Sequence, residues 1–427
     1  MTGGEGERGL SDTEATFAYT HALMRGSGRL TTSFTVHGTF SPERVERAVR
    51  RWLGRLPLLS LRITGADDGL RFRPGTRSGA HSLLTAPAGR DDEVTGERLW
   101  RLRAGPGPAG TTRFRLTLHP AICDGHSVGR LVRPLLDALF DTPGPDAADR
   151  AVEALPPDTD ELTYEGGGGC VCGACGPVPG LGDGRTRRGV TPGAVTRGVA
   201  TSNVVTSNVV TSGVVTPGVV TLALTPYESR RLREWCGAGQ VTVSGFLTTV
   251  LADVLARETG RSEVTVATAM SLRRRYAERT LIAEPGCVLG LVKARLSAGV
   301  TGDALGRARA NAAALCSAGR AWRPERRVHA GIRHAVEREA RARGPEVRVV
   351  DAGSVDTALG PHAARITGLC TVAARGSGRP GGSLYLSTFK GALTVALSSR
   401  GLGESWTARA ERELSEAVLL RPALSPL

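Results

Sequence analysis

Two histidines, an aspartate and a serine lie within nine residues of one another, in the stretch H-P-A-I-C-D-G-H-S that begins at His119. Each of these side chains can take part in proton transfer or nucleophilic attack. The neutral imidazole of His119 or His126 can accept a proton near pH 7, and the hydroxyl of Ser127 becomes a nucleophile when a neighbouring base removes its proton. The carboxylate of Asp124 can orient either group or pair with a cation. This stretch is therefore the first candidate for an active site.

The second half of the stretch, G-H-S-V-G, matches the G-x-S-x-G turn that presents the nucleophile of serine hydrolases. That interpretation needs a buried strand running directly into the turn, with an acid and a histidine later in the chain. Asp351 and His362 follow in the required order. However, five residues separate Leu118 from Asp124, so the strand does not run directly into the turn. A serine hydrolase is therefore the less favoured alternative.

The motif is enclosed by a strand and a helix. Residues 111–118 alternate, with Phe114, Leu116 and Leu118 on one face, which predicts a strand. The segment S-V-G-R-L-V-R-P-L-L-D-A-L-F has apolar residues at helical spacing despite Pro134, which predicts a helix. The predicted order is strand, motif loop, helix.

The N-terminal third contains another well-marked helix. In F-S-P-E-R-V-E-R-A-V-R-R-W-L-G-R, Ser41 can cap the helix, Pro42 suits its first position and apolar residues recur at helical spacing. Pro57 marks its end, and L-S-L-R-I-T-G then alternates as a strand does.

The second half of the chain predicts a similar mixture of elements. Thr225 and Glu228 form a capping box, and the apolar helix T-V-S-G-F-L-T-T-V-L-A-D-V-L-A-R-E-T ends at Gly260. S-E-V-T-V-A-T-A-M-S predicts a strand, G-S-L-Y-L-S-T-F-K-G-A-L-T-V-A-L-S-S a hairpin that turns at Lys390, and S-W-T-A-R-A-E-R-E-L-S-E-A-V-L-L a final helix. The fold class is therefore α/β in the broad sense that includes α+β.

A change of composition divides the chain. From about residue 156 to residue 220, a glycine-rich piece is followed by six five-residue units that begin at Thr191. Units this short offer no way to bury a core, so we expect a largely disordered linker; a local β-ribbon is the alternative. The predicted organisation is an N-terminal lobe (1–155), the linker (156–220) and a C-terminal lobe (221–427).

Three cysteines in the glycine-rich piece, Cys170, Cys172 and Cys175, form a C-x-C-x-x-C pattern. Three thiolates could bind a soft metal ion. No second ligand group with the spacing of a zinc site follows, so we expect no metal. The wide spacing of the eight cysteines favours reduced thiols over a disulfide framework.

Composition and charge exclude several partners. The net charge is +14, but almost all basic residues are arginines, scattered along the chain, and no zinc-finger or RNA-recognition signature accompanies them. We therefore expect no nucleic-acid partner. The N-terminus has no secretory signal, and no uncharged apolar run is long enough to span a membrane. A cytoplasmic protein without a membrane span is the expectation.

Six segments together resemble one superfamily. They are S-P-E-R-V-E-R-A-V-R-R-W-L-G-R-L-P-L-L-S-L-R-I, H-P-A-I-C-D-G, V-T-V-S-G-F-L-T-T-V-L-A-D-V-L, M-S-L-R-R-R-Y, P-G-C-V-L-G-L-V and L-Y-L-S-T-F-K-G-A-L-T-V-A-L. In this order, over most of the chain, they resemble the chloramphenicol-acetyltransferase-like superfamily, closest to condensation domains and to polyketide-associated acyltransferases of the phthiocerol dimycocerosyl transferase type. The resemblance implies two α/β lobes that form a V, with a tunnel at their junction.

The family signature H-H-x-x-x-D-G assigns roles by resemblance. Its second histidine removes the acceptor's proton, its aspartate pairs with an arginine of the other lobe, and its glycine permits a tight turn. His119 matches the first histidine, and Asp124 and Gly125 match the end of the signature. Arg273, in S-L-R-R-R-Y, is the candidate partner of Asp124. The base position falls on Pro120, which has no titratable group.

The resemblance implies an enzyme with a non-standard active site. The reaction would be acyl transfer from a carrier-protein phosphopantetheine or coenzyme A thioester to a hydroxyl or amine acceptor, small or carrier-bound. The pathway would make a polyketide, lipid or nonribosomal peptide. His119 or His126 would replace the missing base, and we expect no bound cofactor. The alternative is a catalytically degenerate protein of the same fold that binds a carrier or pathway enzyme.

Overall fold

We describe the protein from a computed structural model. The residues that the structure describes are 7–65, 69–75, 81–83, 94–96, 98–142, 158–160, 219–273, 275, 284–298, 303–342, 344–375, 380–400 and 404–419. The helices are α1 (Asp12–Leu23), α2 (Pro42–Arg55), α3 (Val128–Leu139), α4 (Pro226–Ala238), α5 (Val243–Thr259), α6 (Ala304–Ala321), α7 (His329–Arg341), α8 (Asp356–Leu359) and α9 (Glu404–Leu419).

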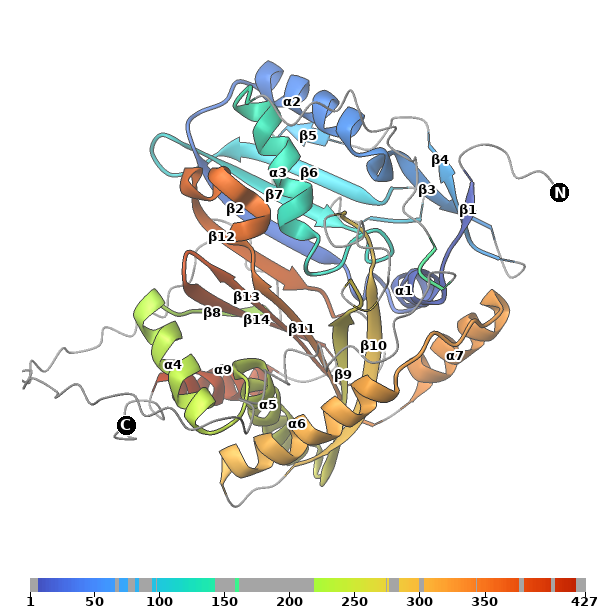
Figure 1. Cartoon of the computed structure of the whole chain (residues 1–427), viewed down its shortest axis with the longest axis vertical. Coiled ribbons are helices and arrows are strands. Elements are labelled where there is room, and N and C mark those ends of the chain that lie inside the picture. The colour runs from blue at the N-terminus through green and yellow to red at the C-terminus, as the bar shows by residue number, and fades with distance from the viewer. Residues whose placement is uncertain are drawn as a thin grey trace, which may run out of the picture.

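The first sheet has five strands in the order β12-β2-β7-β6-β5. Its strands are β2 (Leu30–His37), β5 (His81–Leu83), β6 (Trp100–Pro106), β7 (Thr111–Leu118) and β12 (Ile366–Ala373). The alternation along β7 places Phe114, Leu116 and Leu118 in the core. The helices α2 and α3 pack against each other over this sheet (Figure 1). A small sheet of β1 (Arg8–Gly9), β4 (Arg71–Pro74) and β3 (Leu61–Thr64) lies beside it.

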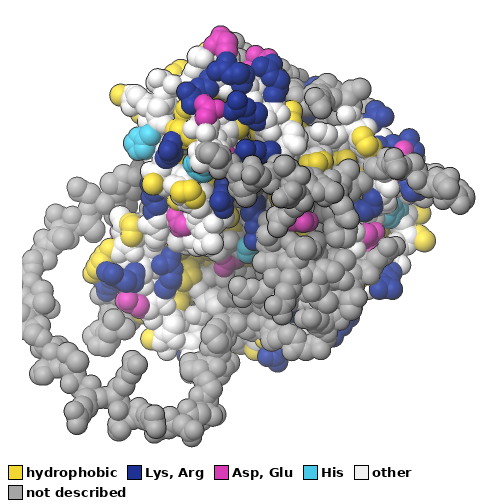
Figure 2. Space-filling view, turned by 45° about the horizontal axis from the view of Figure 1, so that its top comes forward, with side chains coloured by type: hydrophobic (Ala, Val, Ile, Leu, Met, Phe, Trp, Pro, Cys, Tyr) yellow, Lys and Arg dark blue, Asp and Glu magenta, His cyan; other side chains and the backbone are white. Residues whose placement is uncertain are grey.

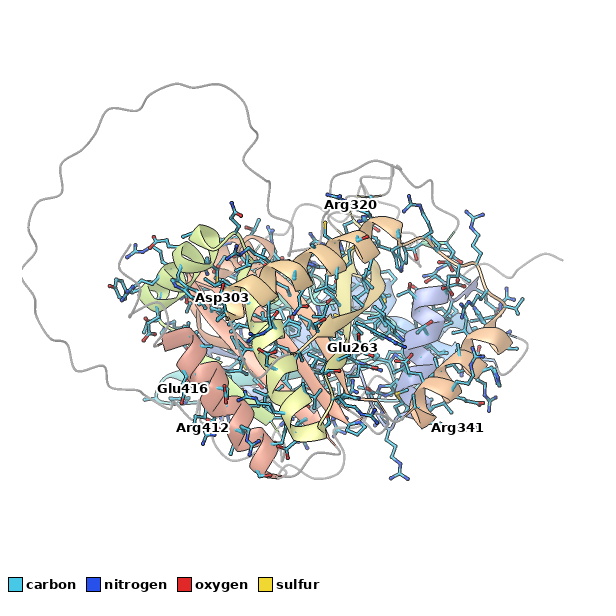
Figure 3. All side chains as sticks on the ribbon, turned by 90° about the horizontal axis from the view of Figure 1, so that it is seen from below. Glu263, Asp303, Arg320, Arg341, Arg412 and Glu416 are labelled. Carbon is cyan, nitrogen blue, oxygen red and sulfur yellow. The ribbon has the colours of Figure 1, made fainter. Side chains whose placement is uncertain are left out.

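The second sheet has six strands in the order β10-β9-β11-β13-β14-β8. Its strands are β8 (Val219–Ala223), β9 (Glu263–Ser271), β10 (Leu289–Ser297), β11 (Glu346–Ser354), β13 (Gly381–Phe389) and β14 (Ala392–Arg400). The strands β9, β11 and β13 are parallel, and the others pair antiparallel. The helices α5, α6 and α9 form a layer on this sheet, with Asp303 and Arg320 marking the two ends of α6 in Figure 3.

One strand crosses between the two halves of the chain. The strand β12 comes from the C-terminal half, yet it pairs antiparallel with β2 at the edge of the first sheet, with Leu369 opposite Phe34. Buried threonines support the exchange, since the hydroxyls of Thr32 and Thr371 are hydrogen-bonded at 2.9 Å. The first sheet is therefore complete when both halves of the chain are present.

The strongest local sequence signals correspond to observed elements. α2 starts after Ser41, whose hydroxyl accepts from the N–H of Arg44 at 3.3 Å. α4 starts with the capping box of Thr225 and Glu228, and α5 ends at Gly260 with a φ of 63°. The predicted hairpin is observed as β13 and β14, and the predicted final helix is observed as α9. The elements α1, α6, α7, β11 and β12 were not predicted from the sequence.

The expected linker contains two described segments. Val219 and Val220 belong to β8 and pair with β14, so the predicted boundary at residue 220 cuts a strand. Asp160 accepts a hydrogen bond from the N–H of Asp12, at the start of α1. The three cysteines of the C-x-C-x-x-C pattern and the five-residue units from Thr191 lie outside the described residues.

The described cysteines differ in redox state. Cys123, Cys236, Cys287 and Cys370 are free. Cys316 is disulfide-bonded, so the expectation of reduced thiols is wrong at that residue.

Surface charge on α2 is partly neutralised by local pairing. Figure 2 shows basic side chains gathered near α2, with acidic side chains among them. Arg44 and Arg51 pair with Asp141, and Arg50 pairs with Glu46. The absence of a nucleic-acid partner stays a prediction.

Among the described residues, no single helix is long and apolar enough to cross a membrane. One pair of helices, α4 and α5, passes such a test jointly, but the pair is bent by 86°.

A deletion tests the organisation of the chain. Replacing residues 161–216 by a Gly-Ser bridge of about 20 residues should leave one cooperative thermal unfolding transition near the original midpoint, because the five-residue units cannot support a core. A matched deletion that continues through Ala223 removes β8 and should lower the midpoint clearly. Loss of cooperative unfolding in the shorter deletion would show that the excised segment belongs to the core.

Candidate functional site

The motif loop connects β7 to α3 and is almost completely buried. His119, Asp124 and Ser127 are each exposed by 2% or less. The loop lies against the segment before β10, because the N–H of Asp124 donates to the carbonyl of Gly286 at 3.2 Å. His126 is the half-buried member of the loop.

The carboxylate of Asp124 is fully hydrogen-bonded. One oxygen, Oδ2, accepts from Nη1 of Arg273 and from the N–H of Val288 at 3.0 Å. The other, Oδ1, accepts from the N–H and the hydroxyl of Ser127 at 2.9 and 2.8 Å. Burial alone would raise the pKa of Asp124, but the charges of Arg273 and His126 and the hydrogen bonds from Arg273 and Ser127 together outweigh it, so the pKa lies below its ordinary value. The structure thus brings Asp124 and Arg273 together, as the resemblance implies.

Ser127 is held in the same network. Its hydroxyl lies 2.8 Å from the carbonyl of Gly286 and accepts from Nη2 of Arg273 at 2.9 Å and from the N–H of Gly286 at 3.0 Å. We call the side chains of Asp124, Ser127 and Arg273, with the backbone of residues 286–288, the latch. A serine bonded in this way orients the latch and does not contact a histidine base.

The contacts argue against the serine hydrolase interpretation. The downstream histidine, His362, is bonded to Asp137 at 2.6 Å instead of to Ser127. A hydrolase requires a histidine within hydrogen-bond reach of the nucleophile. The described contacts therefore do not assemble Ser127, His362 and Asp351 into a triad.

Gly125 is required for close packing and not for a left-handed turn. A Cβ at this position would lie 2.8 Å from Cγ1 of Val350 and 3.5 Å from Cβ of Ala352, both on β11. Gly125 lies in the turn that the hydrogen bond from the N–H of Ser127 to the carbonyl of Asp124 closes, and it is absent from the described residues with positive φ, so this turn does not need the left-handed conformation. The Tyr385 hydroxyl also donates to its carbonyl at 3.3 Å. Any side chain at residue 125 would push β11 away from the motif loop.

His119 is placed as a structural residue. Its Nδ1 accepts from the N–H of Ala121 at 3.2 Å, so in the neutral ring the proton is on Nε2. Its ring centroid lies 4.3 Å from that of His21. Burial first, and then His21, hold the pKa of His119 well below its ordinary value. With its lone pair already accepting a hydrogen bond, His119 is a poor candidate for the base.

Pro120 is buried at the position of the family base. A Cβ built on Gly28 would lie 3.5 Å from both Cβ and Cγ of Pro120, so the proline ring lies beside the turn between α1 and β2. It makes none of the hydrogen bonds of the latch. The ion pair of Asp124 and Arg273 therefore forms without any contribution from residue 120.

His126 has the properties of an available base. Burial lowers the pKa of His126, and the charges of Asp124 and Asp351 oppose this effect while those of Arg273 and Arg130 add to it. The net pKa lies below the ordinary value, so the ring is neutral near pH 7. In the described part of the chain no hydrogen bond occupies its ring nitrogens.

The parallel strands β9 and β11 separate at the latch. Their pairing ends at Ala269 and Val350, after which β9 leads toward Arg273 and β11 reaches Asp351. We call the place where this pairing ends, between Ala269 and Val350, the fork.

Two buried thiols flank the latch. Cys123 and Cys287 are exposed by 2% and 3%. Burial raises the pKa of both thiols well above the ordinary value, and Asp124 raises both further. They therefore stay protonated and are poor nucleophiles. Among the described residues no cluster of three or more acidic, histidine or cysteine side chains could hold a metal ion.

Removing the Asp124 carboxylate should destabilise the protein strongly. Asp124→Ala leaves Arg273 buried and unpaired, which should cost about 3–5 kcal/mol in urea unfolding. Because the pKa is lowered in the folded state, this stabilisation is present above the unfolded pKa, near 3.8, and is lost as the pH falls through the folded value. The exposed Asp141 provides the control: Asp141→Asn, which tolerates the φ of 50° at this residue, should cost less than about 1 kcal/mol. Equal effects of the two substitutions would contradict a buried latch.

Comparison with known proteins now identifies the fold. No protein-family profile matches the sequence, and no curated protein matches it. Solved structures do match over nearly the whole chain. Polyketide synthase associated protein 5 from Mycobacterium tuberculosis matches with a TM-score of 0.59 at 15% identity, covering 100% of both chains.

Two further structures agree. The trichothecene 15-O-acetyltransferase TRI3 from Fusarium sporotrichioides matches with a TM-score of 0.64 at 12% identity, covering 97% of this chain and 95% of that one. A mutant starter condensation domain of the rhizomide synthetase, in complex with C8-CoA, matches with a TM-score of 0.61 at 14% identity, covering 98% and 95%. Identities this low show the fold alone. The chain has the α/β fold of condensation domains and related acyltransferases, as its sequence motifs imply.

Proposed function

We propose that this protein transfers an acyl group from a thioester to an amine or hydroxyl acceptor in the synthesis of a secondary metabolite, with His126 as the base. The fold supports the reaction class, since its structural neighbours include an acetyltransferase and a condensation domain. The single observation that carries the proposal is the neutral, half-buried imidazole of His126 next to an intact latch.

The chemistry balances at His126. The acceptor's nitrogen or oxygen attacks the thioester carbonyl, and His126 removes the acceptor's proton as the new bond forms. When the tetrahedral intermediate collapses, the carbon–sulfur bond breaks and the sulfur leaves as a thiolate. The imidazolium of His126 returns the proton to that sulfur. The products are the acylated acceptor and the free thiol.

The donor is either acyl-coenzyme A or an acyl group on a carrier protein's phosphopantetheine. The two share the thioester and the pantetheine arm, so one site can accept both. The rhizomide synthetase neighbour binds C8-CoA, which makes octanoyl-coenzyme A a practical first donor. The acceptor would approach the fork, because His126 is adjacent to it.

A second function is favoured by one specific residue. Pro120 stands where the family base is expected, so the protein could bind a carrier or pathway enzyme without catalysis. Neither the latch nor the fold distinguishes this function from the first. The experiments below separate them.

Substitution of His126 tests the base directly. His126→Ala should reduce kcat/KM for octanoyl transfer to an amine acceptor by about 10²–10⁴-fold, measured as acylated product by mass spectrometry. His334→Ala, at an exposed histidine of α7, is the matched control and should leave the rate unchanged. An unaltered thermal midpoint in His126→Ala would show that the loss is chemical. Equal rates for both variants would remove His126 from the mechanism.

Restoring the family base separates the two functions. If the wild-type protein is an enzyme, Pro120→His should change its transfer rate by less than about tenfold, because a base is already present. If wild type transfers nothing from any thioester tested while Pro120→His does, the natural protein is a binding descendant. That outcome would replace the enzymatic proposal with the second function.

A further inference from the structure

The peptide bond that precedes His126 is held by a side chain of the second sheet. Tyr385 lies on β13, opposite Val350 of β11, and is 1% exposed. Its hydroxyl donates to the carbonyl of Gly125 at 3.3 Å. This carbonyl belongs to the peptide unit that Gly125 shares with His126, so the hydrogen bond acts directly on the backbone that carries the proposed base.

The environment of Tyr385 keeps its hydroxyl a donor. Burial raises the pKa of this phenol, so the hydroxyl stays protonated. A Cβ at Gly125 would lie 3.5 Å from the hydroxyl oxygen of Tyr385, so the phenol packs directly on residue 125. Gly125 is buried as well. A buried hydroxyl and a buried carbonyl that bond to each other avoid the cost of leaving either group unpaired.

The bonded carbonyl lies in the middle of a turn. Residues 124–127 form this turn, which is closed by the bond from the N–H of Ser127 to the carbonyl of Asp124 at 3.1 Å. The latch fixes both of these end residues, and the central residues are Gly125 and His126. Turns of types I and II differ in the orientation of the peptide between the central residues. That peptide could therefore rotate while the latch stays in place, and its rotation would redirect His126.

The structure shows one orientation of this peptide. Neither Gly125 nor His126 is among the described residues with positive φ. A type II turn needs a positive φ at its third residue, which here is His126, so the turn is not of type II. The hydroxyl of Tyr385 bonds to the carbonyl that points the other way after such a rotation. The hydrogen bond therefore favours the observed orientation over the rotated one.

We propose that Tyr385 is a positioning residue for the proposed base, because its hydroxyl holds the carbonyl of Gly125 and thereby fixes the direction in which His126 presents its imidazole. The inference rests on the proposed function. Tyr385 exchanges no proton with the substrates, since its hydroxyl is bonded to the backbone. Orientation matters to acyl transfer because the base must lie within hydrogen-bond reach of the acceptor.

The sequence allows the Gly125 carbonyl to be observed by itself. Among the eight histidines of the chain, His126 is the one that follows a glycine. Labelling the full-length protein with ¹³C at glycine carbonyls and ¹⁵N at histidine therefore gives one correlation signal, from the peptide bond of Gly125 and His126. Tyr385→Phe removes the hydroxyl and keeps the ring. The ¹³C signal should move upfield in this variant, because a carbonyl that accepts a hydrogen bond is deshielded.

Tyr227→Phe is the matched control. It removes the same hydroxyl from a tyrosine of α4 that is 59% exposed. The Gly125 signal should not change in this variant. An unchanged signal in Tyr385→Phe as well would overturn the inference, because the carbonyl would then not depend on the hydroxyl.

Kinetics supply the second readout. In Tyr385→Phe, kcat for octanoyl transfer should fall by roughly 10- to 100-fold, with KM changed by less than about threefold. In the background of His126→Ala, the same substitution should lower the rate by less than about twofold, because no base remains to be oriented. A residue with a merely structural role would lower the rate equally in both backgrounds, and that result would contradict the positioning role.

The two proposals can fail separately. If Tyr385→Phe moves the Gly125 signal but His126→Ala transfers acyl groups at the wild-type rate, the proposed base is refuted and the positioning role is refuted with it. If His126→Ala is inactive but Tyr385→Phe leaves both the signal and kcat unchanged, the base is supported and the positioning role alone is refuted.

Discussion

The buried carboxylate of Asp124 is the constraint on which the site depends. An ionised carboxylate without partners costs several kcal/mol in a protein interior, so the surrounding chain must supply donors. It does so from Ser127, Arg273 and the N–H of Val288. These donors belong to three separate segments, and satisfying one carboxylate therefore fixes the start of α3, the end of β9 and the approach to β10 relative to one another.

Strand pairing and close packing also hold the two halves of the chain together around the latch. The strand β12 carries the C-terminal half of the chain into the first sheet, and β11 packs against Gly125 closely enough to exclude a side chain. Neither contact depends on the charge of Asp124. Both therefore hold the two halves of the chain together independently of the ion pair.

The elements that the sequence predicted correctly are those marked by residues close together in the chain. Alternation identified β7, and capping residues identified α2 and α4, because each depends on side chains a few residues apart. The pairing of β12 with β2 was not predictable in this way, since it joins residues more than 300 positions apart. Gly125 was predicted to matter for a turn. The structure instead requires glycine there because β11 packs against it, and no local pattern near residue 125 predicts that contact.

The latch does not depend on residue 120. It is held by Asp124, Ser127 and Arg273, none of which bonds to Pro120. His126 lies between Gly125 and Ser127, whose positions are fixed by packing and hydrogen bonds, and its backbone is therefore rigid without further support. His126 thus lies beside the part of β11 that packs against Gly125, whereas Pro120 packs beside Gly28 at the end of β7.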